Sequence, residues 1–106
     1  MNWSKLVDNP NIRISRGMLL KFRTKHPFKE EVIMMTCEEG LNPFGLGLIA
    51  LTGTQVGNNM YTLFPKEATS EGLIAKSLIE NWDKWVNSDS TINEIMIDEG
   101  LLGHEI

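Results

Sequence analysis

The spacing of apolar residues changes along this chain of 106 residues. As far as Phe64, short apolar runs alternate with polar positions at a period of two, which is typical of half-buried β-strands. The clearest run is MLLKFRT, in which Met18, Leu20 and Phe22 share one face. A helix remains an alternative for residues 31–37, because Met34 and Met35 interrupt the β-branched pattern. The predicted strands are residues 11–15, 18–24, 31–37, 48–52, 59–64 and 92–97.

Turn-forming residues separate these runs. Glycine and asparagine in TGTQVGN, residues 52–58, supply the positive φ angles of a hairpin turn, so the strands on either side are predicted to pair antiparallel. Pro65 lacks a backbone N–H, and the second of these strands is expected to end near Phe64. Residues 24–31, TKHPFKEE, are polar and include Pro27, which predicts a loop.

From Thr69 the period changes to that of an α-helix. At 100° per residue, the apolar side chains of residues 74–86 fall within one arc of roughly 140°. The sequence therefore predicts one main amphipathic helix at about residues 70–87. Both tryptophans of LIENWDKWV lie inside the arc, so we expect core packing rather than a ligand-stacking platform. The expected core residues of this helix are Ile74, Leu78, Trp82 and Trp85.

The fold class follows from these elements. A helix and a sheet each need a partner to bury their apolar faces. We predict an α+β fold, in which an antiparallel sheet of about five or six strands carries the helix on one face. The length fits one domain over residues 1–106. No apolar run approaches the roughly 20 residues of a membrane span, the N-terminal residues lack a signal-peptide pattern, and there is a single cysteine. The expected location is the cytoplasm, without membrane attachment.

The net charge of −4 is unevenly distributed. Residues 80–106 hold seven acidic residues and Lys84 as the single basic one, a net charge of −6, while residues 1–79 hold nine basic and seven acidic residues, a net charge of +2. Such polarity favours a basic partner at the C-terminal part, because complementary fields raise encounter rates. The alternative is a solvated surface that keeps the protein soluble.

Residues capable of catalysis or metal binding are few. Gly45 to Ala50, GLGLIA, matches the letters of a dinucleotide-binding loop, but a β-rich segment follows where that loop needs a helix. His26 and His104 lack the fixed partner of a general base, and Cys37 lacks the signature of a nucleophile, although a small enzyme using one of them is the competing hypothesis. No zinc or calcium spacing occurs. We expect no catalytic residue, no cofactor and no metal ion.

A basic stripe suggests contact with nucleic acid. Lys21, Arg23 and Lys25 alternate along one strand and share one face. The chain is acidic overall, however, and no helix-turn-helix or RNA-binding aromatic motif accompanies the stripe. We therefore expect an exposed sheet face there and no direct nucleic-acid partner.

Two segments together indicate a family. YTLFPKEA, residues 61–68, leads from a strand into a Pro-Lys-Glu segment, and LIENWDKWV, residues 78–86, places Asn-Trp-x-x-Trp in the helix that follows. The pair resembles the immunity proteins of bacterial polymorphic toxin systems, most closely the immunity protein 45 family. The resemblance covers roughly residues 17–86 and leaves the acidic tail outside.

The resemblance implies a single non-catalytic immunity-like domain, made by a bacterium, that binds the C-terminal domain of a cognate toxin and blocks it, as in contact-dependent growth inhibition and other toxin–antitoxin pairs. Many toxins of such systems are nucleases with basic clefts, so the acidic tail is expected to imitate phosphates. The runner-up is a small cytoplasmic adaptor without a toxin partner, and the oligomeric state stays open. The expected partner-binding residues are the acids Glu94, Asp98 and Glu99 and the aromatic anchors Phe44 and Tyr61, with Phe28 as a further exposed aromatic.

Overall fold

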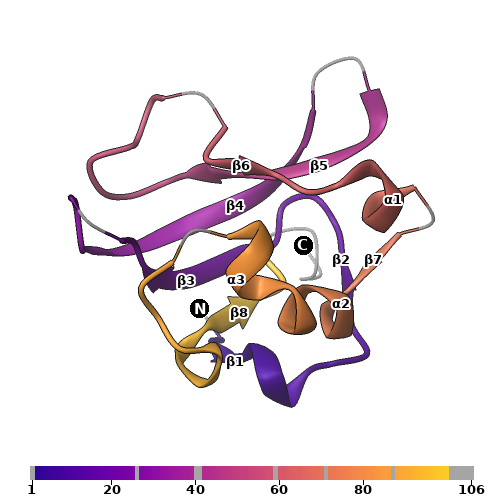
Figure 1. Cartoon of the computed structure of the whole chain (residues 1–106), viewed down its shortest axis with the longest axis horizontal. Coiled ribbons are helices and arrows are strands. Elements are labelled where there is room, and N and C mark those ends of the chain that lie inside the picture. Colours follow the sequence, from indigo (N-terminus) through magenta and orange to yellow (C-terminus); the bar gives the residue numbers. More distant parts are fainter. Residues whose placement is uncertain are drawn as a thin grey trace.

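The computed structural model describes residues 2–25, 27–39, 42–58, 60–70, 72–86 and 88–100, and for residues 39 and 42–44 it describes the backbone. Within these residues the chain forms a six-stranded antiparallel sheet with the order β1-β8-β3-β4-β5-β6 and a separate antiparallel pair, β2-β7 (Figure 1). The strands are β1 Ser4–Lys5, β2 Arg13–Ile14, β3 Leu19–Arg23, β4 Glu31–Glu39, β5 Asn42–Ala50, β6 Thr62–Leu63, β7 Leu73–Ile74 and β8 Met96–Asp98. The helical segments are η1 Leu6–Asp8, α1 Lys66–Thr69, α2 Ala75–Glu80, α3 Trp82–Trp85 and η2 Ile92–Glu94, of which η1 and η2 are 3-10 turns.

The mixed α and β architecture with an antiparallel sheet is confirmed. Residues 31–37 belong to strand β4, which decides between the strand and helix alternatives. The predicted strand at 92–97 is shorter than expected, because residues 92–94 form η2 and the strand β8 begins at Met96. None of the helices in the described ranges is long and apolar enough to cross a membrane.

The hairpin of β5 and β6 is displaced from its predicted position. Strand β5 begins at Asn42, ahead of the expected start at residue 48, and β6 is only Thr62–Leu63. Gly47 explains part of the difference, since a Cβ atom there would collide with the Met60 side chain and the Thr62 carbonyl. Gly47 of GLGLIA therefore allows close pairing with β6, and no helix follows this segment.

The prediction of one helix at 70–87 is wrong, and two long-range features explain why. Residues Leu73 and Ile74 are extended and pair with Arg13 and Ile14 as strand β7, so the helix cannot begin before Ala75. The first amides of α2 then bond to an earlier part of the chain, from Ala75 N to the Ile12 carbonyl and from Lys76 N to the Pro10 carbonyl, both at 2.8 Å.

Asn81 interrupts the helical segment a second time. Its backbone leaves the helical region at φ −115° and ψ 14°, and its side-chain amide donates to the Ser77 carbonyl at 2.9 Å. Asparagine competes with the helical ladder in this way, so α2 ends at Glu80 and α3 starts at Trp82. Two short helices thus occupy the place of the predicted one.

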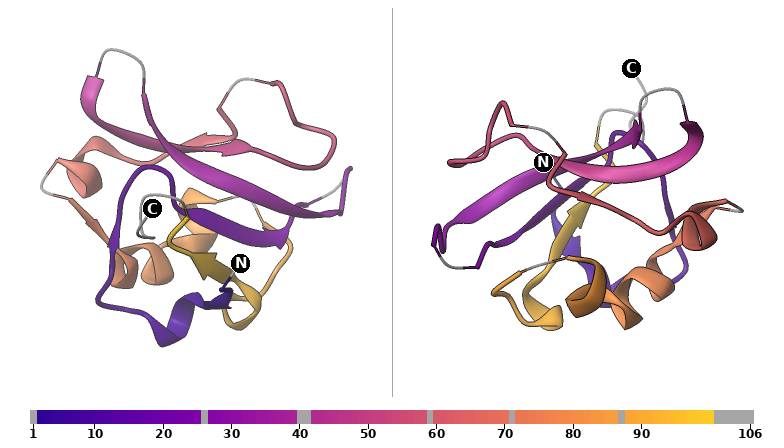
Figure 2. Two further views of the ribbon diagram at one scale, coloured as in Figure 1. Left: turned by 180° about the vertical axis from the view of Figure 1, so that it is seen from behind. Right: turned by 45° about the horizontal axis from the view of Figure 1, so that its top comes forward.

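The register of the strands assigns the two faces of the sheet. Directly opposed residues in antiparallel strands point to the same side. On the inner face Leu20 is opposite Met34 and Phe22 is opposite Val32, and all four side chains are buried. Figure 2 shows the helices gathered on this side of the long β4–β5 layer.

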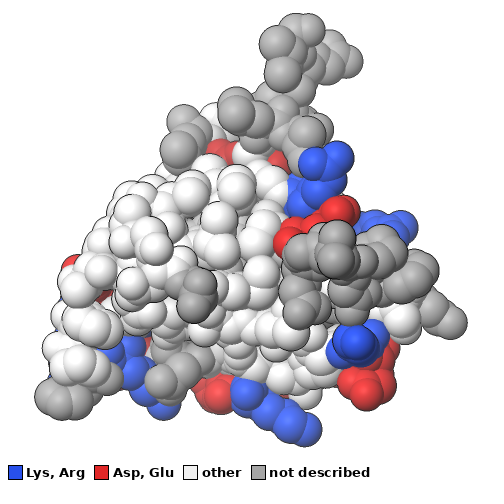
Figure 3. Space-filling view, turned by 90° about the horizontal axis from the view of Figure 1, so that it is seen from above, with Lys and Arg blue, Asp and Glu red and all other residues white. Residues whose placement is uncertain are grey.

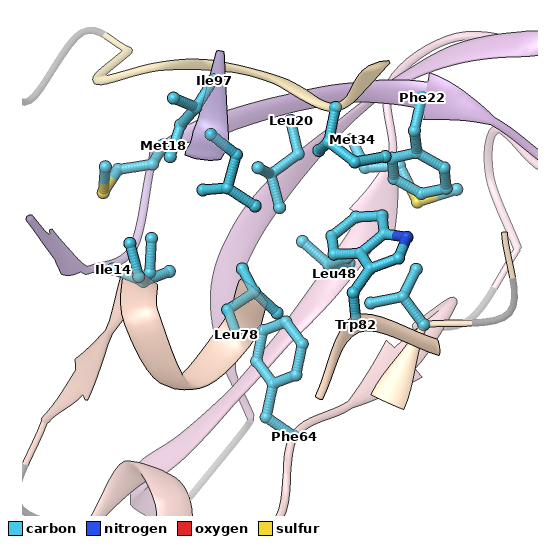
Figure 4. Packing of buried hydrophobic residues seen from close by; sticks show 14 of the residues in the cluster. Ile14, Met18, Leu20, Phe22, Met34, Leu48, Phe64, Leu78, Trp82 and Ile97 are labelled. Atoms are coloured by element: carbon cyan, nitrogen blue, oxygen red, sulfur yellow. The ribbon is translucent and has the colours of Figure 1, made fainter. Parts of the chain in front are cut away.

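Trp82 joins the helices to the inner face. Its indole ring is 2% exposed and meets the Phe22 ring edge to face, with the ring centres 5.2 Å apart and the planes at 84°. The indole Nε1 has no hydrogen-bond acceptor among the described residues, and Figure 4 shows this nitrogen on the side of the Phe22 ring.

The other residues expected in the helix core divide into two groups. Leu78 is buried, and Trp85 is half-buried against Phe64, with ring centres 6.2 Å apart. Ile74 is 49% exposed, which corrects its assignment to the core. The reason is the extended conformation of β7, in which neighbouring side chains point to opposite sides, so that Leu73 is buried and Ile74 is not.

Candidate partner-binding surfaces

The acidic side chains of residues 80–99 fall into an exposed set and one buried member. The exposed set, called here the acidic segment, is Glu80, Asp83, Asp89, Glu94 and Glu99. It is distributed over α2, α3, η2 and the turns beside them. Lys84 is the single basic residue in this stretch. Exposed carboxylates on short helical turns project their field into solvent and are available to a basic partner.

Glu94 is the most precisely held acid of this segment. Its Oε1 atom accepts hydrogen bonds from the Thr91 hydroxyl at 2.7 Å and from the Thr91 N–H at 3.2 Å, which completes a capping box at the start of η2. The hydroxyl bond is the main cause that lowers the pKa of Glu94, followed by the backbone bond, and the positive charge of Arg23 adds to them. The carboxylate is therefore ionised and fixed in direction while it stays exposed.

Asp98 lies inside the protein, unlike its neighbours in the sequence. Its side chain is 4% exposed, and its two oxygens accept hydrogen bonds from the backbone N–H groups of Asn2 and Gly100, each at 2.7 Å. It borders an open hollow of about 270 Å³ beside β1 and β8. A carboxylate placed in this way ties the N-terminal residues to the end of β8 and has little surface to offer a partner. Glu99, the next residue, is exposed.

The two expected aromatic anchors, Phe44 and Tyr61, lie near β5 and β6, at the edge of the sheet away from β8. Phe44 belongs to β5, and its side chain is outside the described part of the structure. Tyr61 precedes β6 and is half-buried, with its ring centre 6.1 Å from that of Phe22, and burial raises its pKa. Its ring packs on the core instead of projecting as a free anchor.

The five expected partner-binding residues are thus divided between two places. Strands β3 and β4 lie between β8 and β5 in the sheet. Three strand spacings correspond to roughly 14 Å between β8 and β5. The acids and the two aromatic residues therefore do not form one surface.

The second surface is the outer face of β4, β5 and β6, which sequence reasoning missed. The register places Met35 opposite Ile49, and Cys37 opposite Gly47, which is in turn opposite Leu63. These side chains point away from the helices, and those of Met35, Cys37 and Ile49 are partly exposed, while Leu63 is 46% exposed. We call this the uncharged sheet face, and it consists of Ile33, Met35, Cys37, Ile49 and Leu63, together with Leu51, whose N–H donates to the Ile33 carbonyl where the chain leaves β5.

A signal in the sequence marks this face. Residues 40–65 form a run of 26 positions without Asp, Glu, Lys, Arg or His, in a chain that is 23% charged. Figure 3 shows the consequence, a broad area without charged side chains on the side of the molecule where β5 and β6 lie. A count of charge-free positions would have found this surface where a search for hydrophobic periodicity did not.

A carboxylate from the neighbouring hairpin positions the loop at the end of this face. Glu30 accepts a hydrogen bond from the Thr54 N–H at 2.6 Å, and the Thr52 hydroxyl accepts one from the Ile33 N–H at 2.8 Å. Gly53, at φ +89°, has no room for a Cβ beside the Glu30 carboxylate. These contacts hold residues 52–54 beside the start of β4, and Val56, later in the same loop, is 51% exposed.

The expected basic stripe is partly engaged by the protein itself. The Lys21 ammonium lies 4.6 Å from the centre of the Trp3 ring, which is cation–π distance. The Arg23 guanidinium donates to the Lys29 carbonyl at 2.9 Å. Lys25 is exposed. The stripe therefore offers fewer free cations than its spacing suggested.

Two arginines border a second hollow. It measures about 340 Å³ and lies between β2, β4, β5 and the segment after α1. Arg16 pairs with Glu38 across it at 3.6 Å, with both side chains more than half exposed, and the Arg13 guanidinium lies against Gly72. Exposed pairs of this kind contribute little to stability, and the hollow is open to solvent.

The residues considered for catalysis are not brought together. Cys37 is half-buried on the uncharged sheet face, and desolvation raises the pKa of its thiol. His26 and His104 both lie outside the described residues. Within the described ranges, no group of three or more His, Cys, Asp or Glu side chains is arranged to hold a metal ion.

Comparison with known proteins gives one family. The protein-family model for immunity protein 45 matches residues 6–97 of the 106-residue chain. The match extends from η1 into β8, so it includes Glu94, which the shorter resemblance had left outside, and it excludes Asp98 and Glu99. No curated protein and no solved structure matches the chain at a significant level.

Proposed function

Because the chain belongs to the immunity protein 45 family, whose name implies toxin neutralisation by a non-catalytic inhibitor, we propose that it binds the C-terminal domain of one cognate bacterial toxin and blocks it by occlusion. The toxin in this proposal is a nuclease of a polymorphic or contact-dependent system. The protein acts in the cytoplasm of the cell that makes the toxin. Binding is stoichiometric and chemically passive.

The observation that carries the nuclease proposal is the exposed acidic segment. Five carboxylates point into solvent over residues 80–99 against a single lysine. A nuclease cleft must hold a polyanion and is therefore lined with cations. A rigid protein surface of opposite sign is steered towards such a cleft, and it occupies the positions of the phosphates once it is bound.

In this proposal the three acids expected in that contact have unequal parts. Glu94 is exposed and already fixed by Thr91, so it loses little conformational freedom on binding. Glu99 is exposed at the end of β8. Asp98 supports the surface from within through its bonds to Asn2 and Gly100. In the refined proposal Glu94 and Glu99 make the contact, and Asp98 positions the chain ends beside them.

Two measurements test the function and the mechanism separately. For the function, the toxin domain encoded beside this gene is expressed with and without this chain, and survival only in its presence is expected. For the mechanism, the toxin affinity of the double variant Glu94→Gln, Glu99→Gln is compared with that of wild type at low and high salt. We expect about a tenfold loss at low salt that shrinks as salt screens the wild-type contact.

A matched control removes two charges elsewhere. Glu31 and Glu67 are exposed acids on β4 and α1, and the double variant Glu31→Gln, Glu67→Gln has the same net charge as the test variant. Its affinity should stay close to that of wild type. Equal losses of affinity in both variants would mean that net charge alone causes the effect. Unchanged affinity in the test variant would reject phosphate imitation. Death of the co-expressing cells would reject the immunity function itself.

A further inference from the structure

The uncharged sheet face is an apolar surface that no described helix covers. The helical segments in the described part of the chain pack on the inner side of the sheet, whereas Leu63 and Leu51 are each more than two-fifths exposed. Contiguous apolar area of this kind on a small protein marks an interaction site. We propose that a second copy of this chain docks here, forming a twofold dimer by packing sheet face against sheet face.

Charge favours a copy of the same chain on this face. A twofold interface brings the same patch of both partners together, so any unpaired charge in the patch would face its own copy and be buried twice. The residues that make up the face are uncharged, as is the whole run of residues 40–65, so packing them against a copy avoids this penalty. Lys21, which lies opposite Ile33 at the border of the face, is held against the Trp3 ring. The acidic segment, which makes two chains of net charge −4 repel each other, is then directed away from the partner.

The side of the molecule that carries this face is large enough for a standard interface. The molecule is nearly equal in its three dimensions, 34 × 31 × 30 Å. One side of such a body is about one sixth of the 6566 Å² accessible surface, or about 1,100 Å², against roughly 800 Å² per partner in a standard interface.

Edge pairing is the poorer geometry for this dimer. Strand β6, the edge strand on this side, has only two residues, and both already pair with β5. A ladder between two such edges would be too short to hold two proteins together. Face packing at the usual sheet separation of about 10 Å uses the exposed side chains of β4, β5 and β6 instead.

The reactivity of Cys37 can be used to detect this interface. Cys37 is the only cysteine of the sequence and lies on the proposed interface, in line with Gly47 and Leu63. Alkylation of wild-type protein by a maleimide is therefore expected to slow severalfold between about 1 μM and about 200 μM protein, as the dimer forms by mass action. A rate that does not change with protein concentration would overturn the proposal.

Light scattering with a matched pair of variants provides the second test. Leu63 and Ile74 are similar in size and exposure, at 46% and 49%, but Ile74 lies on β7, outside the face. Leu63→Lys should raise the dimer dissociation constant about tenfold or more, and Ile74→Lys should leave it unchanged. Circular dichroism checks that both variants are folded.

Three other results would overturn the proposed dimer. Wild type that is monomeric at about 200 μM, or equal dissociation by both variants, would overturn the dimer on this face. Protection of Cys37 by the toxin domain in dilute solution would assign the face to the toxin and would also overturn it. The dimer does not rest on the proposed function, because every measurement without toxin can be made on the isolated chain.

Discussion

The acidic segment and the uncharged sheet face show two ways in which a small protein presents a surface. The first is built from separate carboxylates on short helices and turns, and the second from neighbouring side chains on long paired strands. Carboxylates act at a distance and are screened by salt, while apolar side chains act on contact and depend little on salt. A partner that is steered by charge and a partner that is held by burial can therefore use the same molecule without competing.

The largest effect is expected from a substitution in the core, because the core supports both surfaces. Trp82→Ala deletes the indole that packs on Phe22 between α3 and the sheet. We expect a loss of about 3–5 kcal/mol in the free energy of unfolding, measured by denaturant titration. Trp85→Ala, at a half-buried position, is the control and should cost clearly less. Similar losses would contradict the assignment of Trp82 as the central residue.

A second prediction separates the buried acid from the exposed ones. Asp98→Asn leaves one oxygen and places an amide where the two backbone N–H groups of Asn2 and Gly100 now donate to a carboxylate. The expected cost is about 2 kcal/mol of unfolding free energy. Glu99→Gln at the neighbouring exposed position should change stability by less than about 0.5 kcal/mol. If the two variants are equally stable, Asp98 belongs functionally with the exposed set.

A third prediction concerns the uncharged face alone. Glu30→Ala removes the acceptor of the Thr54 N–H and should cost about 1 kcal/mol. Hydrogen exchange should become faster in residues 52–58 and remain unchanged in η2. Glu31→Ala, on the exposed neighbour, provides the control. Faster exchange at both sites would indicate general loosening rather than loss of a local support.

The smallest effect is expected within the capping box of the acidic segment. The hydrogen bonds from Thr91 depress the pKa of Glu94 in the folded state, so their stabilisation is present above the ordinary glutamate pKa and is lost as the pH falls through the depressed value. Thr91→Ala should raise the Glu94 pKa towards its ordinary value, as followed by NMR titration. The sheet face should not respond over the same pH range. An unchanged Glu94 pKa would mean that the capping box is not formed in solution.

The sequence located the sheet better than the helices. Alternation at a period of two is a local property, and it identified the inner face of β3 from Met18, Leu20 and Phe22, all of which are buried. The apolar arc of the helix was also local, and it identified Leu78 and Trp82 as buried positions. The same arc failed at Ile74, because pairing of β7 with β2 depends on residues about 60 positions earlier in the chain.

The candidate surfaces were accessible to the sequence to different degrees. The excess of acid in residues 80–106 was visible as a count, but burial of Asp98 depends on the amide of Asn2, which is 96 positions away. Phe44 and Tyr61 were chosen as aromatic residues, while the more informative feature was the lack of charge around them. A count of charged residues describes the composition of a segment, but it does not show which face of the sheet the residues occupy.

By itself the sequence determined the family, the antiparallel sheet and the polarity of charge, because each follows from short motifs, local periodicity or a sum over residues. Only the tertiary structure decided where the helices begin, which acid is buried and which sheet face stays uncovered. These depend on hydrogen bonds and packing between segments that are distant in the chain, and no local pattern encodes the partner of such a contact.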